Sequence, residues 1–271
     1  MSSTSCESQK QVLARATTYS QAVCGVWPLP KIQQRMLTHN RSGNYRFLAA
    51  KGKPFSGGAV ADEGYDLVHA AFERPLPLEA GLAAASLQVA AAGRPVHAIA
   101  GFELRIPAPL TKAAFDAFNQ RYVTSLRRLG LEVDGLMPAA RTNVAAVVGA
   151  VSEPSLFAVS YTIVAHRTHR AFVLSGAPEE EGADTAARLD SIMRVLADRL
   201  DTLGVSWEDA TAIQMYGVDD FQDLVVDKVL KATGGAAVHG IRWFPSLPPI
   251  EGLKLEIDVR SAGTELVLAR P

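Results

Sequence analysis

Hydrophobic and polar positions along the chain follow two spacings, one typical of helices and one typical of strands. Apolar residues at helical spacing, with a glycine at or near the end, predict three helices, over 77–93, 110–130 and 185–204. A fourth helix is predicted over 219–235, because aspartates at its start favour a helix N-terminus.

Shorter apolar runs bounded by Gly and Pro predict the strands. Residues 45–60 are typical of a β-hairpin, and 143–151 of a buried strand. Residues 155–165 and 171–176 are predicted as two strands joined at the sequence HRTHR. Further strands are predicted within 97–107, 210–218 and, after a Pro-rich turn, 241–262.

The order helix–strand–helix–strand occurs twice, at an offset of about 100–110 residues. FELR at 102–105 occupies the place that IQMY occupies at 213–216. A repeat of this length indicates two copies of one small α+β domain. We therefore predict a first, divergent domain over 43–150 and a second over 151–271, after an N-terminal extension over 1–42.

Composition narrows the functional classes. The chain has 271 residues, 48% of them hydrophobic and 20% charged, with a net charge of −1. This balance argues against a nucleic-acid partner, and no apolar run approaches the roughly 18 residues of a membrane span. The polar start of the chain lacks an apolar signal core, and its two cysteines are too few for a disulfide framework. We expect a cytoplasmic protein.

One charged residue is placed unusually. Arg141 lies in MPAARTNVAAV (137–147), immediately before a small-apolar run. The guanidinium could simply reach solvent at the end of a strand. It could also bind an anion in a cleft, because its planar fork pairs a carboxylate through two parallel hydrogen bonds. The residue by itself does not decide between these readings.

Several segments together resemble the Rid (reactive intermediate deaminase, YjgF-like) family. In the second half these are AFVLSG (171–176), a long helix followed by LGVSWEDATAIQMYGVDDF (203–221), and LPPIEGLKLEIDVRSA (247–262). In the first half, PAARTNV (138–144) is similar to a P-x-R-x-x-V segment of that family. The order of elements suggests a tandem two-domain member that resembles aminomuconate-type deaminases.

The resemblance implies an α+β fold of two tandem chorismate-mutase-like (Rid-type) domains, each a mixed sheet with two helices packed on one face. It implies a homo-oligomer, with a trimer favoured. It also implies hydrolysis of an enamine or imine of a small carboxylic acid, with no metal and no organic cofactor. A 2-aminomuconate-type substrate from aromatic catabolism fits this class.

The resemblance also assigns site residues. Arg141 takes the carboxylate-binding position, and Asn143 takes the position two residues along. Ser175 and Gly176 take a Ser-Gly pair that ends an early strand. Glu256 takes a last-strand glutamate that activates water or handles a proton.

Each half departs from the family pattern. The arginine position of the second half falls near Val238 or His239, so that copy lacks the guanidinium. The glutamate position of the first half falls near Ala158, so that copy lacks the acid. We therefore expect one composite site at an interface between chains, which combines Arg141 with Glu256.

Plainer readings remain open for several residues. His239 could carry a proton or contact substrate, or be an ordinary surface histidine. Asn143 could bind substrate or finish a turn, and Glu256 could face solvent from its strand. His166 and His169 favour a solvated hairpin tip, because no nearby ligand completes a metal site.

We therefore expect a deaminase that releases ammonia, in which Arg141 binds the substrate carboxylate and Glu256 activates water. The alternatives are a chorismatase-like hydrolase or lyase, and a non-catalytic protein that binds small carboxylates.

Overall fold

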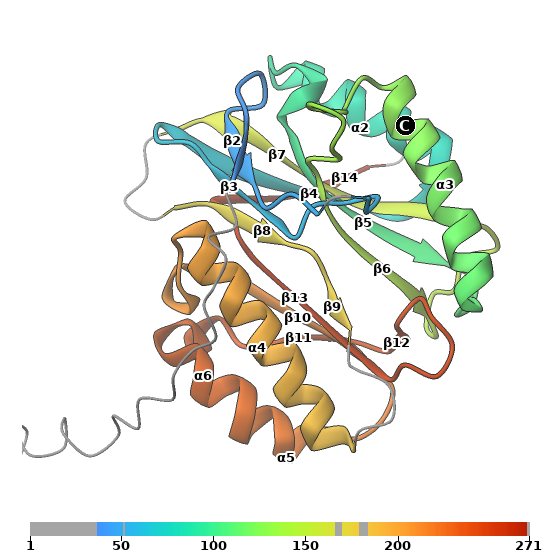
Figure 1. Ribbon diagram of the computed structural model, residues 1–271, viewed down its shortest axis with the longest axis vertical. Helices are drawn as coiled ribbons and strands as arrows, with labels where there is room; N and C mark the ends of the chain where they lie inside the picture. Colours follow the sequence, from blue (N-terminus) through green and yellow to red (C-terminus); the bar gives the residue numbers. More distant parts are fainter. Residues whose placement is uncertain (1–36, 51, 166–169, 179–183, 270–271) are drawn as a thin grey trace, which may run out of the picture. The chain divides into compact units, whose positions relative to one another are not determined.

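The computed structural model describes residues 37–50, 52–165, 170–178 and 184–269. Within these ranges the chain forms two mixed β-sheets with helices packed on them (Figure 1). This arrangement confirms the α+β class. The Rid-type identity of two tandem domains, and the boundaries at 42/43 and 150/151, stay predictions.

A six-stranded sheet carries α2 (Leu78–Ala91) and α3 (Lys112–Arg128). Buried side chains of both helices pack against Phe102 and Leu104 in one hydrophobic core. The strands, in spatial order, are β12 (Ser246–Leu247), β6 (Ala140–Ala146), β5 (Ile99–Ile106), β7 (Ser155–Val164), β4 (Tyr65–Pro77) and β14 (Thr264–Leu268).

An eight-stranded sheet carries α4 (Thr185–Leu203) and a second, irregular helical segment. Its strands, in spatial order, are β1 (Thr38–Asn40), β2 (Tyr45–Phe47), β3 (Gly58–Ala61), β8 (Phe172–Leu174), β13 (Leu255–Ser261), β10 (Ala212–Gly217) and β11 (Arg242–Phe244). The short β9 (Ala177–Pro178) also pairs with β13.

Helix α4 forms for reasons that are visible in the sequence. The Asp184 side chain accepts a hydrogen bond from the Ala187 N–H and caps the N-terminus. Gly204 ends the helix in the left-handed conformation, at a φ of 68°. The apolar stripe of the helix is buried, and burial of each side chain contributes roughly 1.5–3 kcal/mol to the stability of the fold. The stripe comprises Leu189, Ile192, Leu196, Leu200 and Leu203.

The helix predicted over 219–235 is less regular than expected. It consists of α5 (Gln222–Leu224), a π-helical stretch over Val225–Leu230, and α6 (Lys231–Thr233). Three residues of the π-helical stretch are valines, whose β-branched side chains slightly lower helix propensity. A 3₁₀ segment over Gly234–His239 then leads to β11.

The two sheets exchange strands between the ends of the chain. β3 pairs with β8, so the first three strands extend the eight-stranded sheet. β12 pairs with β6, and β14 pairs with β4, so the last part of the chain completes the six-stranded sheet. Each sheet therefore contains strands from both sides of residue 150.

The hairpin expected between 155–165 and 171–176 is wrong. β7 pairs with β4 and β5 in the six-stranded sheet, whereas β8 pairs with β3 and β13 in the other. The chain passes from one sheet to the other between them, and residues 166–169 lie outside the described residues. The hairpin predicted over 45–60 is confirmed, since β2 and β3 pair antiparallel.

The longest strand, β4, was not predicted. Its central residues, 66–70, are all buried, because the strand is covered on both faces. Such a strand shows no alternation of apolar and polar residues, and its sequence YDLVHAAF includes a charge and a histidine.

Strand register corrects the predicted correspondence between the halves. Glu103 pairs with Thr142 in β6, and Gln214 pairs with Arg242 in β11. Glu103 and Gln214 occupy corresponding places in FELR and IQMY, so Thr142 corresponds to Arg242. The residue of the second half that corresponds to Arg141 is therefore Ile241, not Val238 or His239.

The position in the first half that corresponds to Glu256 also differs from the prediction. Arg105 pairs with Ser155, and Tyr216 pairs with Glu256, so the position equivalent to Glu256 is Ser155, not Ala158. Each half still carries only one of the two groups.

The exchanged strands predict that the halves do not fold separately. Residues 43–150 alone lack β7, β12 and β14 of the six-stranded sheet, and residues 151–271 alone lack β1 to β3 of the eight-stranded sheet. We expect each fragment to lack a near-UV circular dichroism signal, because unpaired strand edges and uncovered apolar surface remain. Co-expression of 1–150 with 151–271 is expected to restore the signal. A dispersed amide NMR spectrum from either fragment alone would contradict this prediction.

Candidate active site

The site is built around one edge of β6, where none of the described strands pairs with the stretch from Arg141 to Asn143. The Arg141 N–H donates to Ser175 Oγ at 2.8 Å. The Gly176 N–H donates to the Arg141 carbonyl at 3.2 Å. The Asn143 N–H donates to the Glu256 carboxylate. The edge of the six-stranded sheet is thus completed by residues of the segment after β8 and of β13.

Arg141 lies next to α3, and aromatic rings surround its guanidinium group. Its guanidinium carbon is 4.6 Å from the ring centre of Phe55 and 5.0 Å from that of Tyr122, and Nη1 donates to Asn119 Oδ1 at 2.8 Å. Burial lowers the pKa of Arg141 to about 10, so the group is charged at neutral pH. Among the described residues, its guanidinium forms no ion pair with a carboxylate. Most of its five N–H donors thus remain available to an anion.

Glu256 is 3% exposed, on the face of β13 that is turned away from α4. Burial raises its pKa to about 8, and the negative charge of Asp258 adds to this rise; Arg141 and the Asn143 N–H oppose it. The carboxyl group is therefore largely protonated at pH 7. It lies against Gly176, where any side chain would overlap its oxygen atoms.

Arg141 and Glu256 line one cavity of about 80 Å3. Asn143 and Gly176 line it too, and the remaining wall is apolar, formed by Phe55, Phe115, Pro178, Pro249, Ile250 and Leu253. The Asn143 side chain is buried, yet neither its oxygen nor its nitrogen has a hydrogen-bond partner among the described residues. A buried amide in this state costs free energy unless a ligand satisfies it.

The structure thus brings four of the six expected site residues to one cavity, and it does so within one chain. Ser175 is buried behind the cavity and supports the backbone of Arg141, while its hydroxyl donates to the Ser56 carbonyl at 2.5 Å. His239 is exposed at the end of the 3₁₀ segment and is not part of the cavity wall.

Sequence reasoning missed the residues that support the site. Asn119 and Tyr122 belong to the predicted helix, but nothing in its spacing marked them as neighbours of Arg141. Arg199, on α4, donates to the Ser175 carbonyl at 2.6 Å. Asp258 could have been found, since it lies two residues after Glu256 and so shares its face of the strand.

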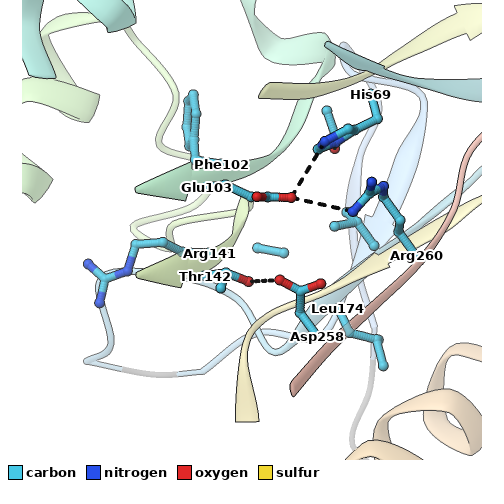
Figure 2. Close-up of a pocket in the computed structure, with 11 residues that line it drawn as sticks. His69, Phe102, Glu103, Arg141, Thr142, Leu174, Asp258 and Arg260 are labelled. Atoms are coloured by element: carbon cyan, nitrogen blue, oxygen red, sulfur yellow. Dashed lines mark hydrogen bonds and ion pairs between the residues drawn. The ribbon is translucent and has the colours of Figure 1, made fainter. Parts of the chain in front are cut away.

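A second polar group lies between the two sheets (Figure 2). Glu103 accepts a hydrogen bond from Gln214 at 2.8 Å and pairs with Arg105 and Arg260 at 3.3 and 3.4 Å. Although burial opposes it, His69 and these two arginines hold the pKa of Glu103 well below its usual range.

Asp258 belongs to the same group. It accepts hydrogen bonds from Thr142 at 2.6 Å and Tyr216 at 2.9 Å. Burial, and next the charge of Glu103, raise the pKa of Asp258. Thr142 and Asp258 come from different sheets, and each lies within two residues of the cavity wall.

Comparison with known proteins identifies the family. The family described as 2-aminomuconate deaminase CnbZ matches residues 37–266. The chain belongs to this family. It is also 33% identical, over 245 residues, to a 2-amino-5-chloromuconate deaminase of Comamonas testosteroni, covering 83% of this chain and 96% of that protein.

Two solved structures are more distantly similar. A Mycobacterium tuberculosis member of the YjgF/YER057c/UK114 family is 20% identical, covers 35% of this chain and 81% of its own, and has a TM-score of 0.30. A chorismatase is 14% identical, and the similarity covers 76% of this chain and 77% of the chorismatase chain, with a TM-score of 0.45.

The family match and the curated relative confirm the resemblance to aminomuconate-type deaminases, and they support deamination as the general activity. Among the described helices, none is long and apolar enough to span a membrane. Across the described ranges, no three His, Cys, Asp or Glu side chains are grouped as metal ligands.

The raised pKa of Glu256 predicts a pH-dependent stability. Its folded-state pKa of about 8 exceeds the ordinary value of 4.5, so its contribution is complete below pH 4.5 and is lost as pH rises to about 8. Glu256→Gln stays neutral throughout. We expect the free energy of unfolding of the variant to rise relative to that of wild type by up to about 1.4 kcal/mol per pH unit across this window.

Urea unfolding at pH 5, 6.5 and 8 measures this difference. The exposed Glu63→Gln is the control and should follow wild type. A constant gap between Glu256→Gln and wild type from pH 5 to 8 would show that Glu256 titrates normally.

Proposed function

We propose that the chain is a hydrolase that deaminates an enamine or imine of a small carboxylic acid of the 2-aminomuconate type and releases ammonia. The observation that carries this proposal is that Arg141, Asn143 and Glu256, each of them buried, line one cavity. The chain's membership of an aminomuconate deaminase family supports the same reaction. The chemistry uses side chains alone and requires no metal or organic cofactor.

Arg141 binds the carboxylate next to the amino group. Its guanidinium is held by Asn119 and by aromatic rings, so its position is fixed before substrate arrives. Beside a mostly apolar wall, a bidentate pair with a carboxylate is strong. The flat, conjugated carbon chain of a muconate-type acid then lies along the apolar wall, between Phe55, Phe115 and Ile250.

Glu256 supplies the first proton. In its protonated form it donates to the carbon β to the nitrogen; the C=C electrons form the new C–H bond, and the nitrogen lone pair forms C=N⁺. The enamine becomes an iminium ion, and Glu256 becomes a carboxylate. A group with a pKa near the working pH suits both halves of this exchange.

Water completes the reaction. Its oxygen attacks the iminium carbon while Glu256 accepts a proton, which gives a neutral carbinolamine. Glu256 returns the proton to nitrogen, the C–N bond breaks, and the hydroxyl proton of the new carbonyl passes back to Glu256. Enamine and water are thus converted to an oxo acid and ammonia, and Glu256 ends protonated as it began.

The Asn143 amide holds the reacting nitrogen. Its Oδ1 has no partner among the described residues and accepts a hydrogen bond from the substrate amino group. Ser175 and Gly176 act indirectly, because they fix the β6 edge and leave room for Glu256. His239 has no part in this mechanism. A homotrimer in the cytoplasm completes the proposal, and light scattering would measure the mass of the assembly.

Ammonia release tests the function. With 2-aminomuconate and simpler 2-amino-enoic acids, Arg141→Met is expected to raise KM strongly, and Glu256→Gln to lower kcat by about 100-fold or more. Exposed matched controls, Arg128→Met and Glu63→Gln, should behave as wild type.

Each outcome selects one reading. No ammonia above the spontaneous rate from wild type would overturn the deaminase. Carboxylate binding by wild type without turnover would instead support the non-catalytic binder. Turnover of a cyclic enol-ether acid in place of enamines would support the chorismatase-like alternative.

Asn143→Leu separates function from stability. Removing an unsatisfied buried amide is expected to stabilise the free protein by about 1–3 kcal/mol, whereas turnover falls because the amino group loses its acceptor. Thermal unfolding and ammonia release are measured on the same sample. A variant that is less stable than wild type would show that the amide has a structural partner.

A further inference from the structure

Beside the bond from the Asn143 N–H to Glu256, a side-chain hydrogen bond also joins the two strands that carry the site. Thr142 lies between Arg141 and Asn143 on β6, and Asp258 lies two residues after Glu256 on β13. Thr142 Oγ1 donates to Asp258 Oδ2 at 2.6 Å, and both residues are buried. The bond therefore connects the strand that carries the carboxylate-binding group with the strand that carries the acid (Figure 2).

Asp258 is itself firmly held. Tyr216 and Gln214, both on β10, donate to its carboxylate at 2.9 Å and at 3.1 and 3.3 Å. β10 also pairs with β13, so Asp258 is fixed within the eight-stranded sheet. Thr142 is fixed within the other sheet, where β6 pairs with β5.

We propose that Thr142 and Asp258 are positioning residues for the deamination: their hydrogen bond sets the place of Glu256 relative to Arg141 and Asn143. This proposal rests on the proposed function. Neither residue touches substrate. Their effect is on alignment, and a misplacement of about 1 Å at a reacting centre can lower the rate roughly 100-fold.

Asp258 has a second, electrostatic effect. It faces Glu256 and Arg260 on its own strand, Tyr216 on β10, Glu103 on β5 and the Thr142 hydroxyl on β6. Arg260 pairs with Glu103 and Glu265, so its charge is shared with two other carboxylates. The Asp258 charge therefore disfavours ionisation of Glu256 and keeps the acid form available.

Two substitutions at Thr142 test the positioning. Thr142→Val removes the donor and keeps the shape, whereas Thr142→Ser keeps the donor. We expect kcat for ammonia release to fall about 10- to 100-fold in Thr142→Val and to stay within about threefold of wild type in Thr142→Ser. KM should change little in either variant, because the Arg141 guanidinium keeps its own supports.

Ser160→Ala is the matched control. Ser160 is also buried between the sheets, but its hydroxyl contacts His69 at 3.0 Å and not Asp258. It should leave kcat unchanged, and thermal unfolding of all three variants confirms that they fold. Wild-type kcat in Thr142→Val, or an equal loss in Ser160→Ala, would overturn the proposal.

Asp258→Asn tests the charge. Removal of the negative charge lowers the pKa of Glu256, so the alkaline limb of kcat/KM should move to lower pH by roughly one unit. A ¹³C NMR titration of labelled glutamate carboxyls, with Glu256 assigned by its loss in Glu256→Gln, should show the same shift without substrate. An unchanged Glu256 titration would overturn the electrostatic effect. Lack of ammonia release by wild type would overturn the proposed function instead, and the titration would still decide the charge coupling.

Discussion

The unpaired edge of β6 at Arg141–Asn143 is the constraint on which the rest of the site depends. Backbone N–H and C=O groups that are buried must find partners, and within the described part of the chain no neighbouring strand supplies them here. A serine hydroxyl, a glycine N–H and a carboxylate take those places. The need to satisfy one strand edge thus brings the segment after β8 and the middle of β13 to the same point, and the cavity forms there.

Burial of charge follows from this geometry. A carboxylate that is buried without a full partner is costly, and Glu256 avoids the cost by holding its proton at neutral pH. Arg141 cannot lose its charge in this way, so aromatic rings and one amide oxygen stabilise it. The cavity therefore presents a cation and a neutral acid, which is the pair that binding and protonation of an anionic enamine require.

Much of this arrangement follows from the sequence, and the part that does not has physical causes. The helices with clear caps and stripes, such as 185–203, were predicted almost to the residue. β4 was missed because burial of both faces removes the alternation that marks a strand. The false hairpin at 155–176 arose because proximity in sequence suggested pairing, whereas the chain changes sheet at that point.

The candidate site residues that line the cavity were proposed through motif resemblance rather than through periodicity. Arg141, Asn143, Gly176 and Glu256 were expected to share a site, but the expectation placed it between chains. Strand exchange within one chain accounts for the difference, and long-range pairing of this kind leaves no local trace in a sequence. The same applies to the Thr142–Asp258 bond, which joins residues 116 positions apart.

The asymmetry between the halves has a physical reason. Equivalent strand positions face one another across the sheets, as Glu103 and Gln214 do at 2.8 Å. Two glutamates at these positions would repel, and two glutamines would leave Arg105 and Arg260 without their shared carboxylate. Identical residues at these two positions therefore could not reproduce this set of contacts. Once the sheets differ along the interface, the site beside it can also divide its groups, with arginine at 141 against isoleucine at 241 and glutamate at 256 against serine at 155. The two groups of the cavity are thus divided between strands that also place different residues at the contact between the sheets.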